Sequence, residues 1–70
     1  MIAFKNNLKQ KRIHKMLTQT DLARLAGFQP SLISHYENGR RSPGIKNLVK
    51  LAEALDCTTD ELIRDESRTH

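Results

Sequence analysis

Apolar residues in this chain recur every three or four positions, the spacing that places side chains on one side of a helix. Between about Ala3 and Met16, the side chains of Phe4, Leu8 and the aliphatic stem of Arg12 follow one another at intervals of four. This segment is predicted to be an amphipathic helix. Its other faces carry Lys5, Lys9, Lys11 and Lys15. We expect water to solvate most of these lysines.

A second helix is predicted to begin after Thr18 and to end at Gly27. The Thr18 hydroxyl is positioned to accept a hydrogen bond from the backbone N–H of Asp21, whose carboxylate suits a positive helix N-terminus. Gly27 follows where a residue with positive φ commonly closes a helix. The predicted apolar face of this short helix consists of Leu22, Ala23, Leu25 and Ala26.

A third helix is predicted to begin at Gln29-Pro30, because proline suits the first turn of a helix, and to stop at Asn38-Gly39. Its predicted buried side consists of Leu32, Ile33 and Tyr36. Its opposite side consists of Gln29, Ser31, Ser34 and His35. The second and third helices are thus short, are separated by a tight turn, and the third presents polar side chains away from the core.

Two further helices are expected in the C-terminal half. A basic loop, residues 40–44, precedes an apolar helical pattern made by Ile45, Leu48, Val49, Leu51, Ala52 and Leu55. Thr58 and Glu61 form a capping-box pattern before a short fifth helix with Leu62 and Ile63. Without any strand-like alternation, the chain is predicted to be all-α, with one domain over residues 1–64 and a polar tail over residues 65–70.

The charge of the chain favours an anionic partner. Twelve Lys and Arg residues against eight Asp and Glu residues give 70 residues a formal net charge of +4. The apolar runs are too short to cross a bilayer, and Cys57 is a single cysteine without an internal disulfide partner. We therefore expect an intracellular, cytoplasmic protein that does not bind membranes.

Catalytic and metal-binding functions find no support in the pattern. The three histidines, His14, His35 and His70, lie far apart beside one cysteine, without the paired spacing of a zinc site. Ser31, Ser34 and His35 lie one or three helix positions apart, without an orienting acid or an oxyanion cradle, and a chain this short buries too little surface to hold a cleft between two lobes. We expect no enzyme activity, no metal, no cofactor and no small-molecule ligand, and we interpret Cys57 as a packing residue.

Two helices joined by a tight turn fit the DNA major groove, where the second helix reads base edges. At this point the chain resembles the Cro/CI (XRE-type) family of helix-turn-helix regulators over roughly Leu8 to Leu62. The residues that carry the resemblance are Leu17-Thr18-Gln19, Leu22-Ala23, Gly27, Ile33-Ser34, Tyr36-Glu37-Asn38-Gly39, Arg41, Pro43, Leu48, Leu51-Ala52, Leu55 and Leu62.

The resemblance implies a five-helix lambda-repressor-like DNA-binding domain with the helix-turn-helix at helices two and three. It further implies a bacterial or phage-encoded regulator of transcription that binds double-stranded DNA. The leading interpretation is a repressor that binds an inverted-repeat operator as a homodimer, with Leu62, Ile63 and the neighbouring tail contributing to the dimer interface. The alternatives are an antitoxin and a restriction-modification controller protein that use the same module.

The same resemblance assigns roles in the recognition helix. Gln29, Pro30, Ser31 and His35 are expected at the bases, and Ser34 nearer the DNA backbone. The chain departs from well-known phage repressors at Pro30, because proline cannot form a bidentate hydrogen-bonded pair with adenine. Direct readout is therefore expected to rest on its neighbours. Leu32 is interpreted either as a contact to a thymine methyl group or as a core residue.

Residues outside the recognition helix are expected to hold phosphates or the scaffold. Gln19 is expected to bind a phosphate at the start of the second helix. Arg40, Arg41 and Lys46 are candidates for phosphate contacts, Arg41 first among them, and the alternative for each is an ordinary solvated charge. The family also pairs an arginine of the first helix with a glutamate of the third, which implies a structural ion pair between Arg12 and Glu37.

Overall fold

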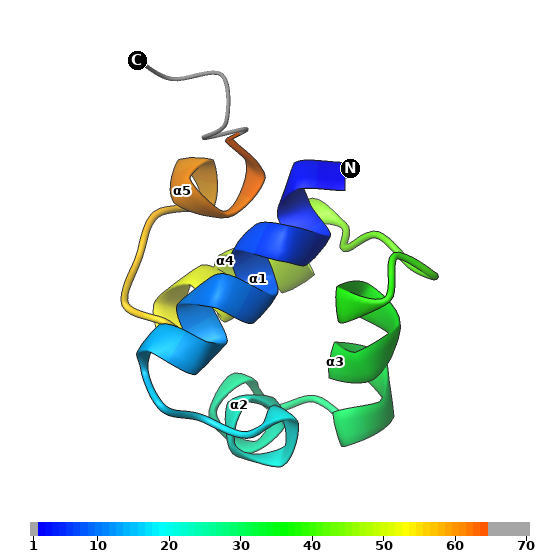
Figure 1. The fold of residues 1–70 in the computed structure, drawn as a ribbon, viewed down its shortest axis with the longest axis vertical. Coiled ribbons are helices and arrows are strands. Elements are labelled where there is room, and N and C mark those ends of the chain that lie inside the picture. Colours follow the sequence, from blue (N-terminus) through cyan, green and yellow to red (C-terminus); the bar gives the residue numbers. More distant parts are fainter. Residues whose placement is uncertain (1, 65–70) are drawn as a thin grey trace.

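Five helices and short connections make up residues 2–64, which are the residues that the computed structural model describes. They are α1 (Ile2–His14), α2 (Gln19–Ala26), α3 (Pro30–Glu37), α4 (Ile45–Ala54) and α5 (Thr59–Ile63) (Figure 1). The predicted all-α, five-helix fold is confirmed, and within the described range there is no strand. The expected polar tail over residues 65–70 lies outside the described residues.

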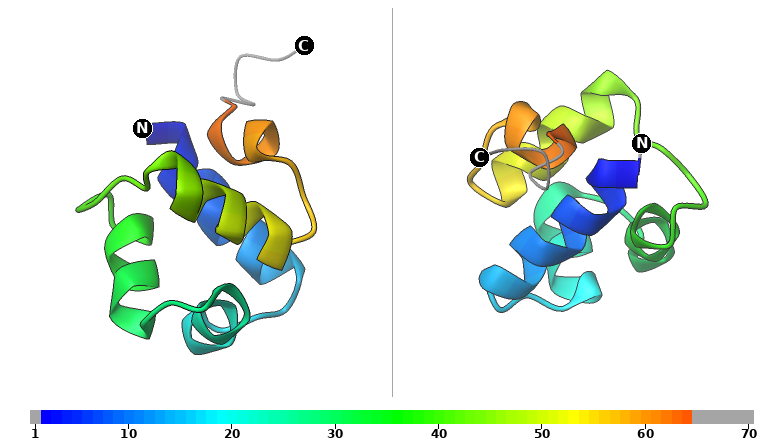
Figure 2. Two further views of the ribbon diagram at one scale, coloured as in Figure 1. Left: turned by 180° about the vertical axis from the view of Figure 1, so that it is seen from behind. Right: turned by 45° about the horizontal axis from the view of Figure 1, so that its top comes forward.

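The helices pack around α1, which crosses the middle of the molecule. In Figure 1, α1 lies between α3 and α5 and contacts both, while α2 packs on α3 and α4. Seen from behind, α4 crosses the back of α1 (Figure 2). None of the helices formed by residues 2–64 combines the length and the apolar character needed to span a bilayer.

The core is formed by the apolar faces that the helical spacing predicted. Its buried members are Phe4, Leu8, Leu22, Ala23, Ala26, Ile33, Tyr36, Leu51, Ala52, Leu55 and Leu62. The rings of Phe4 and Tyr36 meet edge to face, with centroids 5.7 Å apart, and so join α1 to α3. Each fully buried Leu, Ile or Phe contributes about 1.5–3 kcal/mol from removal of its apolar surface from water.

Three residues predicted on apolar faces are exposed instead. Leu25 is 60% exposed, Ile45 83% and Val49 40%. The buried arc of α2 is centred on Leu22 and Ala26, so Leu25 falls at its edge on a helix only two turns long. Ile45 and Val49 lie together on one flank of α4, beside the arc that faces the core. The sequence pattern predicted α2 and α4 correctly, but it assigned exposed residues to their buried faces.

The short helix α5 is held against α1 by the burial of Leu62 and by polar contacts from Asn7 and Lys11. Leu62 is fully buried in the core of the same chain. The Asn7 side-chain amide of α1 donates to the backbone carbonyls of Leu62 and Arg64, at 3.1 and 2.6 Å. The expectation that Leu62 lies at a dimer interface is therefore wrong, because its side chain is used within the protomer. Its neighbour Ile63 is exposed.

Helix ends follow the capping signals of the sequence where those signals are local. The Thr18 hydroxyl accepts from Asp21 N over 3.0 Å and the Asp21 carboxylate accepts from Thr18 N over 3.0 Å. The pair Thr58 and Glu61 repeats this capping box at α5. The first helix was predicted to run to Met16 but ends at His14, because Met16 has a φ of +60° and turns the chain.

Acid is expected to weaken both capping boxes. Hydrogen bonds from the Thr18 and Thr58 backbones hold the pKa of the Asp21 carboxyl below its ordinary 3.8 and that of Glu61 below its ordinary 4.5. A depressed pKa in the folded state stabilises the fold above these ordinary values, and the contribution is lost as pH falls through the folded-state pKa.

Thermal melts between about pH 5 and about pH 2 measure this loss. The double variant Asp21→Asn/Glu61→Gln should lose melting temperature less steeply with acid than the wild type does. Glu53→Gln is the matched control, because Glu53 is exposed and makes no hydrogen bond or ion pair with the described residues. A wild type and a double variant with parallel acid profiles would contradict the assignment.

Candidate nucleic-acid interface

The connection between α2 and α3 fixes where the third helix begins. Gly27 has a φ of +79°, and Phe28 N donates across the turn to Ala23 O over 2.8 Å, which closes α2. The chain re-enters a helix after Gln29, whose extended backbone provides the N-cap position, with Pro30 in the first turn. The Gln29 side chain makes no capping hydrogen bond, so its amide is available for other contacts.

The residues predicted to read bases share the solvent side of α3. Gln29, Pro30 and Ser31 are exposed, and Ser34 and His35 are half-buried. Ile33 and Tyr36 face the core on the opposite side. Ser31, Ser34 and His35 lie three and four positions apart, which gives the polar side chains one common direction.

Leu32 belongs to the core side of α3. Its side chain is partly buried and packs against the core cluster. Of the two interpretations open from the sequence, this contact supports packing over contact with a thymine methyl group.

Asn38 is a polar residue of the same face that was not among the residues predicted to contact DNA. It is exposed, and its side-chain amide donates to Ser34 Oγ over 3.4 Å. Asn38 follows Ser31 by seven positions, two helical turns, so the spacing places it in line with Ser31 and Ser34. That spacing was the signal that could have identified it.

A partly buried polar network ties α3 to α1 and α2. Arg12 Nε donates to Glu37 Oε2 over 2.6 Å and Arg12 Nη2 donates to Glu37 Oε1 over 3.1 Å, which is a bidentate pair. The two side chains are only 13% and 4% exposed. Arg12 Nη1 also donates to the backbone carbonyl of Leu17 over 2.7 Å. The network therefore fixes the C-terminal end of α3 and the connection before α2 at once.

Gln19 joins this network. Its Nε2 donates to Glu37 Oε1 over 3.1 Å. The Gln19 amide is predicted to contact a phosphate. In the structure it also makes a contact between α2 and α3. One N–H of the amide remains beyond this bond, so a phosphate contact by Gln19 stays a prediction.

The basic loop after α3 is anchored by its backbone. The N–H groups of Arg40 and Arg41 donate to the His35 carbonyl at 2.9 and 3.4 Å, while both side chains are exposed. Lys46 is exposed in the first turn of α4, and Asn47 Nδ2 donates to Tyr36 Oη over 3.1 Å, which holds the start of α4 against α3. Within residues 2–64, neither arginine nor Lys46 has an ion-pair partner.

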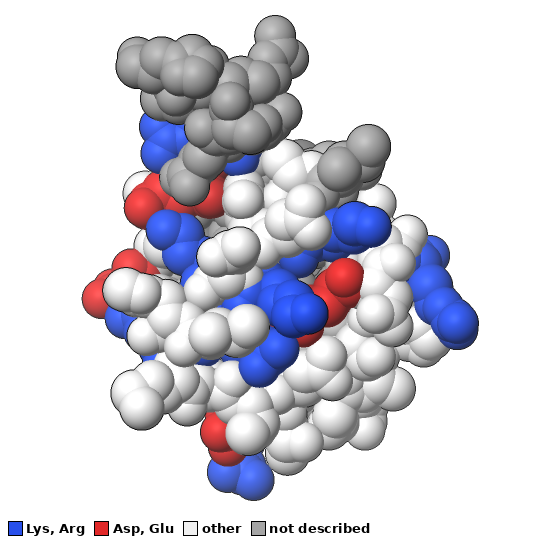
Figure 3. Space-filling model, in the orientation of Figure 1, with Lys and Arg blue, Asp and Glu red and all other residues white. Residues whose placement is uncertain are grey.

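Several basic side chains lie on the face of the molecule seen in Figure 3. Figure 3 shows them over the middle of the view, where α1 crosses it, and at the edge formed by the loop after α3. Arg40 and Arg41 follow the C-terminal end of α3, the helix that carries the candidate base-reading residues.

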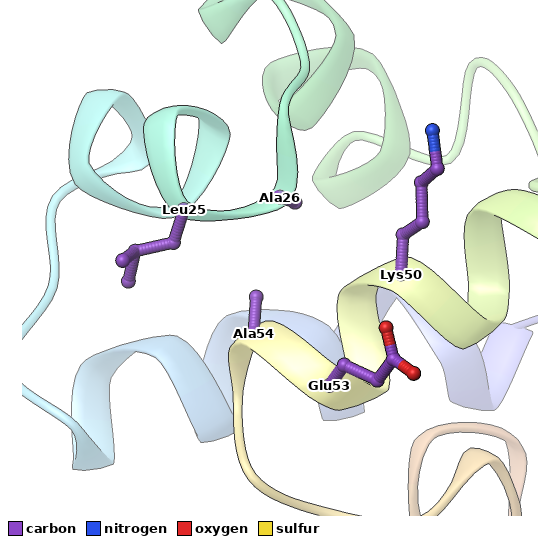
Figure 4. A pocket seen from close by; sticks show the side chains of 5 residues that line it. All are labelled: Leu25, Ala26, Lys50, Glu53 and Ala54. Atoms are coloured by element: carbon purple, nitrogen blue, oxygen red, sulfur yellow. The ribbon is translucent and has the colours of Figure 1, made fainter.

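A shallow groove of about 370 Å³ lies between α2 and α4, away from these candidates. Leu25 and Ala26 from α2 line it opposite Lys50, Glu53 and Ala54 from α4 (Figure 4). No residue predicted to contact DNA lines this groove. It offers one amine and one carboxylate on otherwise apolar walls.

The described residues offer no constellation for metal or thiol chemistry. Among residues 2–64, no three His, Cys, Asp or Glu side chains come together as a metal site would require. Cys57 packs against the core, and burial raises the pKa of its thiol, which disfavours the reactive thiolate.

Comparison with known proteins matches the helix-turn-helix family model to residues 8–62. The chain is 38% identical over 64 residues to the uncharacterized HTH-type transcriptional regulator YqaE of Bacillus subtilis, and this stretch is 91% of the chain. It corresponds to 55% of YqaE, so the chain spans about half the length of that relative.

Two solved structures share the fold closely. The restriction-modification controller protein C.AhdI from Aeromonas hydrophila superposes with a TM-score of 0.84 at 38% identity, over 87% of this chain and 92% of that one. The P22 c2 repressor protein, solved in complex with a synthetic operator, gives a TM-score of 0.82 at 26% identity over the same shares of the two chains.

Proposed function

Because the chain belongs to the helix-turn-helix family, we propose that it is a sequence-specific DNA-binding regulator of transcription. The observation that carries the proposal is the face of α3: Ser31 is exposed and Ser34 and His35 half-exposed, on a helix whose opposite side is anchored in the core. A helix of this kind fits the major groove. Similarity to the P22 c2 repressor, solved with an operator, supports the same function.

In the proposed complex, α3 lies in the major groove with its N-terminal end toward the bases. The Gln29 side chain makes no hydrogen bond to cap α3, and its amide matches the donor and acceptor that adenine presents in the major groove. His35, one turn beyond Ser31, offers a ring N–H to a guanine acceptor or to a phosphate. Pro30 has neither a backbone N–H nor a polar side chain, so the hydrogen bonds to the bases must come from the neighbouring residues.

Phosphate contacts are proposed to set the position of α3. Arg40 and Arg41 lie at its C-terminal end, Lys46 lies in the first turn of α4, and Gln19 lies at the start of α2. These contacts carry little sequence information but supply much of the affinity. Variants of the loop are therefore expected to lower affinity for all sequences, whereas variants of the recognition helix are expected to change the sequence preference.

The regulator is proposed to act as a homodimeric repressor on an inverted repeat. One small module rarely reaches the affinity that two linked half-sites provide. Ile63 on α5 and the flank of α4 formed by Ile45 and Val49 are exposed apolar residues available for a contact between two copies. Binding at an operator would then exclude RNA polymerase.

A restriction-modification controller is the second candidate, favoured by the likeness to C.AhdI at 38% identity. Such a protein would use the same DNA-binding surface. An antitoxin remains a further alternative with that module. The genes beside this one distinguish these roles, because a restriction enzyme, a toxin or a phage operon would each be found there.

Replacing Arg41 by alanine is expected to weaken binding to all sequences alike. The slope of log K against log salt should become shallower by about 0.9, the value of one phosphate contact, while the preferred sequence stays the same. Equilibrium titrations of a preferred and a scrambled duplex at several salt concentrations measure both quantities.

The matched control for this experiment is Lys15→Ala. Lys15 pairs with Asp56 over 3.9 Å, so its charge is already opposed. If Arg41→Ala changed the preferred sequence or left the salt slope at the wild-type value, Arg41 would not be a phosphate contact.

A further inference from the structure

We propose that Lys5 and Lys9 make the exposed side of α1 a second phosphate-binding surface, which contacts the DNA backbone beside the groove occupied by α3. The inference rests on the proposed DNA binding and extends it. It adds two cations from the first helix to contacts that otherwise come from α2, α3, the following loop and α4.

Lys5 lies across the turn that ends α3. Its Cδ and Nζ are 3.1 and 3.6 Å from the position that a Cβ atom on Gly39 would occupy, so the missing side chain of Gly39 leaves room for the lysine stem. Gly39 directly precedes Arg40. The side chain of Lys5 therefore lies beside the start of the basic loop, although Gly39 follows Lys5 by 34 positions in the sequence.

Lys9 continues the same side of α1. It follows Lys5 by four positions and precedes Arg12 by three, so the three side chains share one stripe of the helix. One end of the stripe, Lys5, lies beside Gly39 in the turn after α3, and the other end, Arg12, binds Glu37, the last residue of α3. The stripe therefore runs beside the C-terminal end of the proposed recognition helix, and Figure 3 shows basic side chains over this part of α1.

The two lysines of this stripe differ from Arg12, because no ion pair opposes their charges within the described residues. Within residues 2–64, Lys5 and Lys9 have no ion-pair partner, and the nearby Glu37 carboxylate is occupied by Arg12 and Gln19. The two other lysines of α1 differ, because Lys11 pairs with Glu61 over 3.5 Å and Lys15 pairs with Asp56 over 3.9 Å.

The partner that fits these charges is a phosphodiester backbone. A lysine amine is a point cation on a flexible stem, which suits phosphate oxygens and does not read a base pattern as arginine does. Lys5 is half-buried and its Cδ lies beside Gly39, so we expect its side chain to lose less conformational freedom on binding than a fully exposed lysine loses. If α3 lies in the major groove, the phosphates of the strand that borders this groove are the anions nearest to α1, because α1 packs against α3.

The test compares two double variants of the same helix in binding to a random-sequence DNA duplex over a series of salt concentrations. One is Lys5→Gln/Lys9→Gln, and the control is Lys11→Gln/Lys15→Gln, which removes the same charge from sites already paired with acids. Two lost phosphate contacts should make the salt slope of the first variant shallower by about 1.8, and the control should keep a slope close to that of the wild type. Thermal melts check that both variants fold.

Equal slopes for the two double variants would overturn the inference, since only net charge would then matter. A wild-type slope in Lys5→Gln/Lys9→Gln, together with a shallower slope in Arg41→Ala, would also overturn it while leaving the proposed function intact. A wild type that binds no duplex would remove the proposed function itself. The three failures are thus distinguishable.

Discussion

Replacing Arg12 by alanine is expected to destabilise the fold by about 3–5 kcal/mol, because it leaves the buried Glu37 carboxylate without its cation. The Glu37 side chain is only 4% exposed, and after the change its one remaining side-chain donor among the described residues is the Gln19 amide. The Leu17 carbonyl loses its donor as well. For a domain of this size, such a loss lowers the melting temperature by roughly 12 °C or more.

Thermal and denaturant unfolding of Arg12→Ala and Lys9→Ala measure this effect on the same helix. Lys9 is exposed and unpaired within the described residues, so its loss should change stability by less than about 0.5 kcal/mol. The double variant Arg12→Ala/Glu37→Ala should lose less than the sum of the two single variants, since neither charge is then left buried alone. Equal melting temperatures for Arg12→Ala and Lys9→Ala would rule out the anchoring role of the pair.

Replacing His35 by alanine is expected to relax the sequence preference at one base pair. A good side-chain contact to a base edge is worth about 1–3 kcal/mol of discrimination, which corresponds to roughly fivefold to a hundredfold in relative affinity. Binding to unrelated sequences should change little, because phosphate contacts supply that affinity.

Competition titrations against single-base variants of the preferred site measure the effect of His35→Ala, and Arg41→Ala is the comparison. The first should flatten the preference at one position and the second at none. A His35→Ala protein that weakens on every sequence to the same degree would mean that the ring contacts a phosphate. Because His35 is half-buried, a melting curve of the His35→Ala variant is recorded in parallel to check that it folds.

Local features of the fold were predictable from the sequence because their causes are local. The capping boxes at Thr18 and Thr58 depend on a residue three positions away, and the positive φ at Gly27 depends on the absence of a side chain. The polar face of α3 follows from helical spacing in the same way. Asn38 satisfied that spacing and was missed only because it also suited a helix stop.

Features set by packing between helices were not predictable from spacing. The exposure of Leu25 depends on the angle at which α2 meets α3 and α4, and the contact of Lys5 with Gly39 joins positions 34 residues apart. The bond from Gln19 to Glu37 depends on how closely α2 approaches the end of α3. Met16 adopts a φ of +60° although its side chain gives no local reason to do so.

Selection of binding sites from a pool of random DNA duplexes tests the central claim most directly. The account predicts enrichment of one sequence with two inverted half-sites whose centres lie about 34–36 Å apart, one helical turn of DNA. Enrichment of a single unrepeated half-site would argue against the homodimer alone. A pool that shows no enriched sequence after repeated selection would contradict sequence-specific DNA binding by α3.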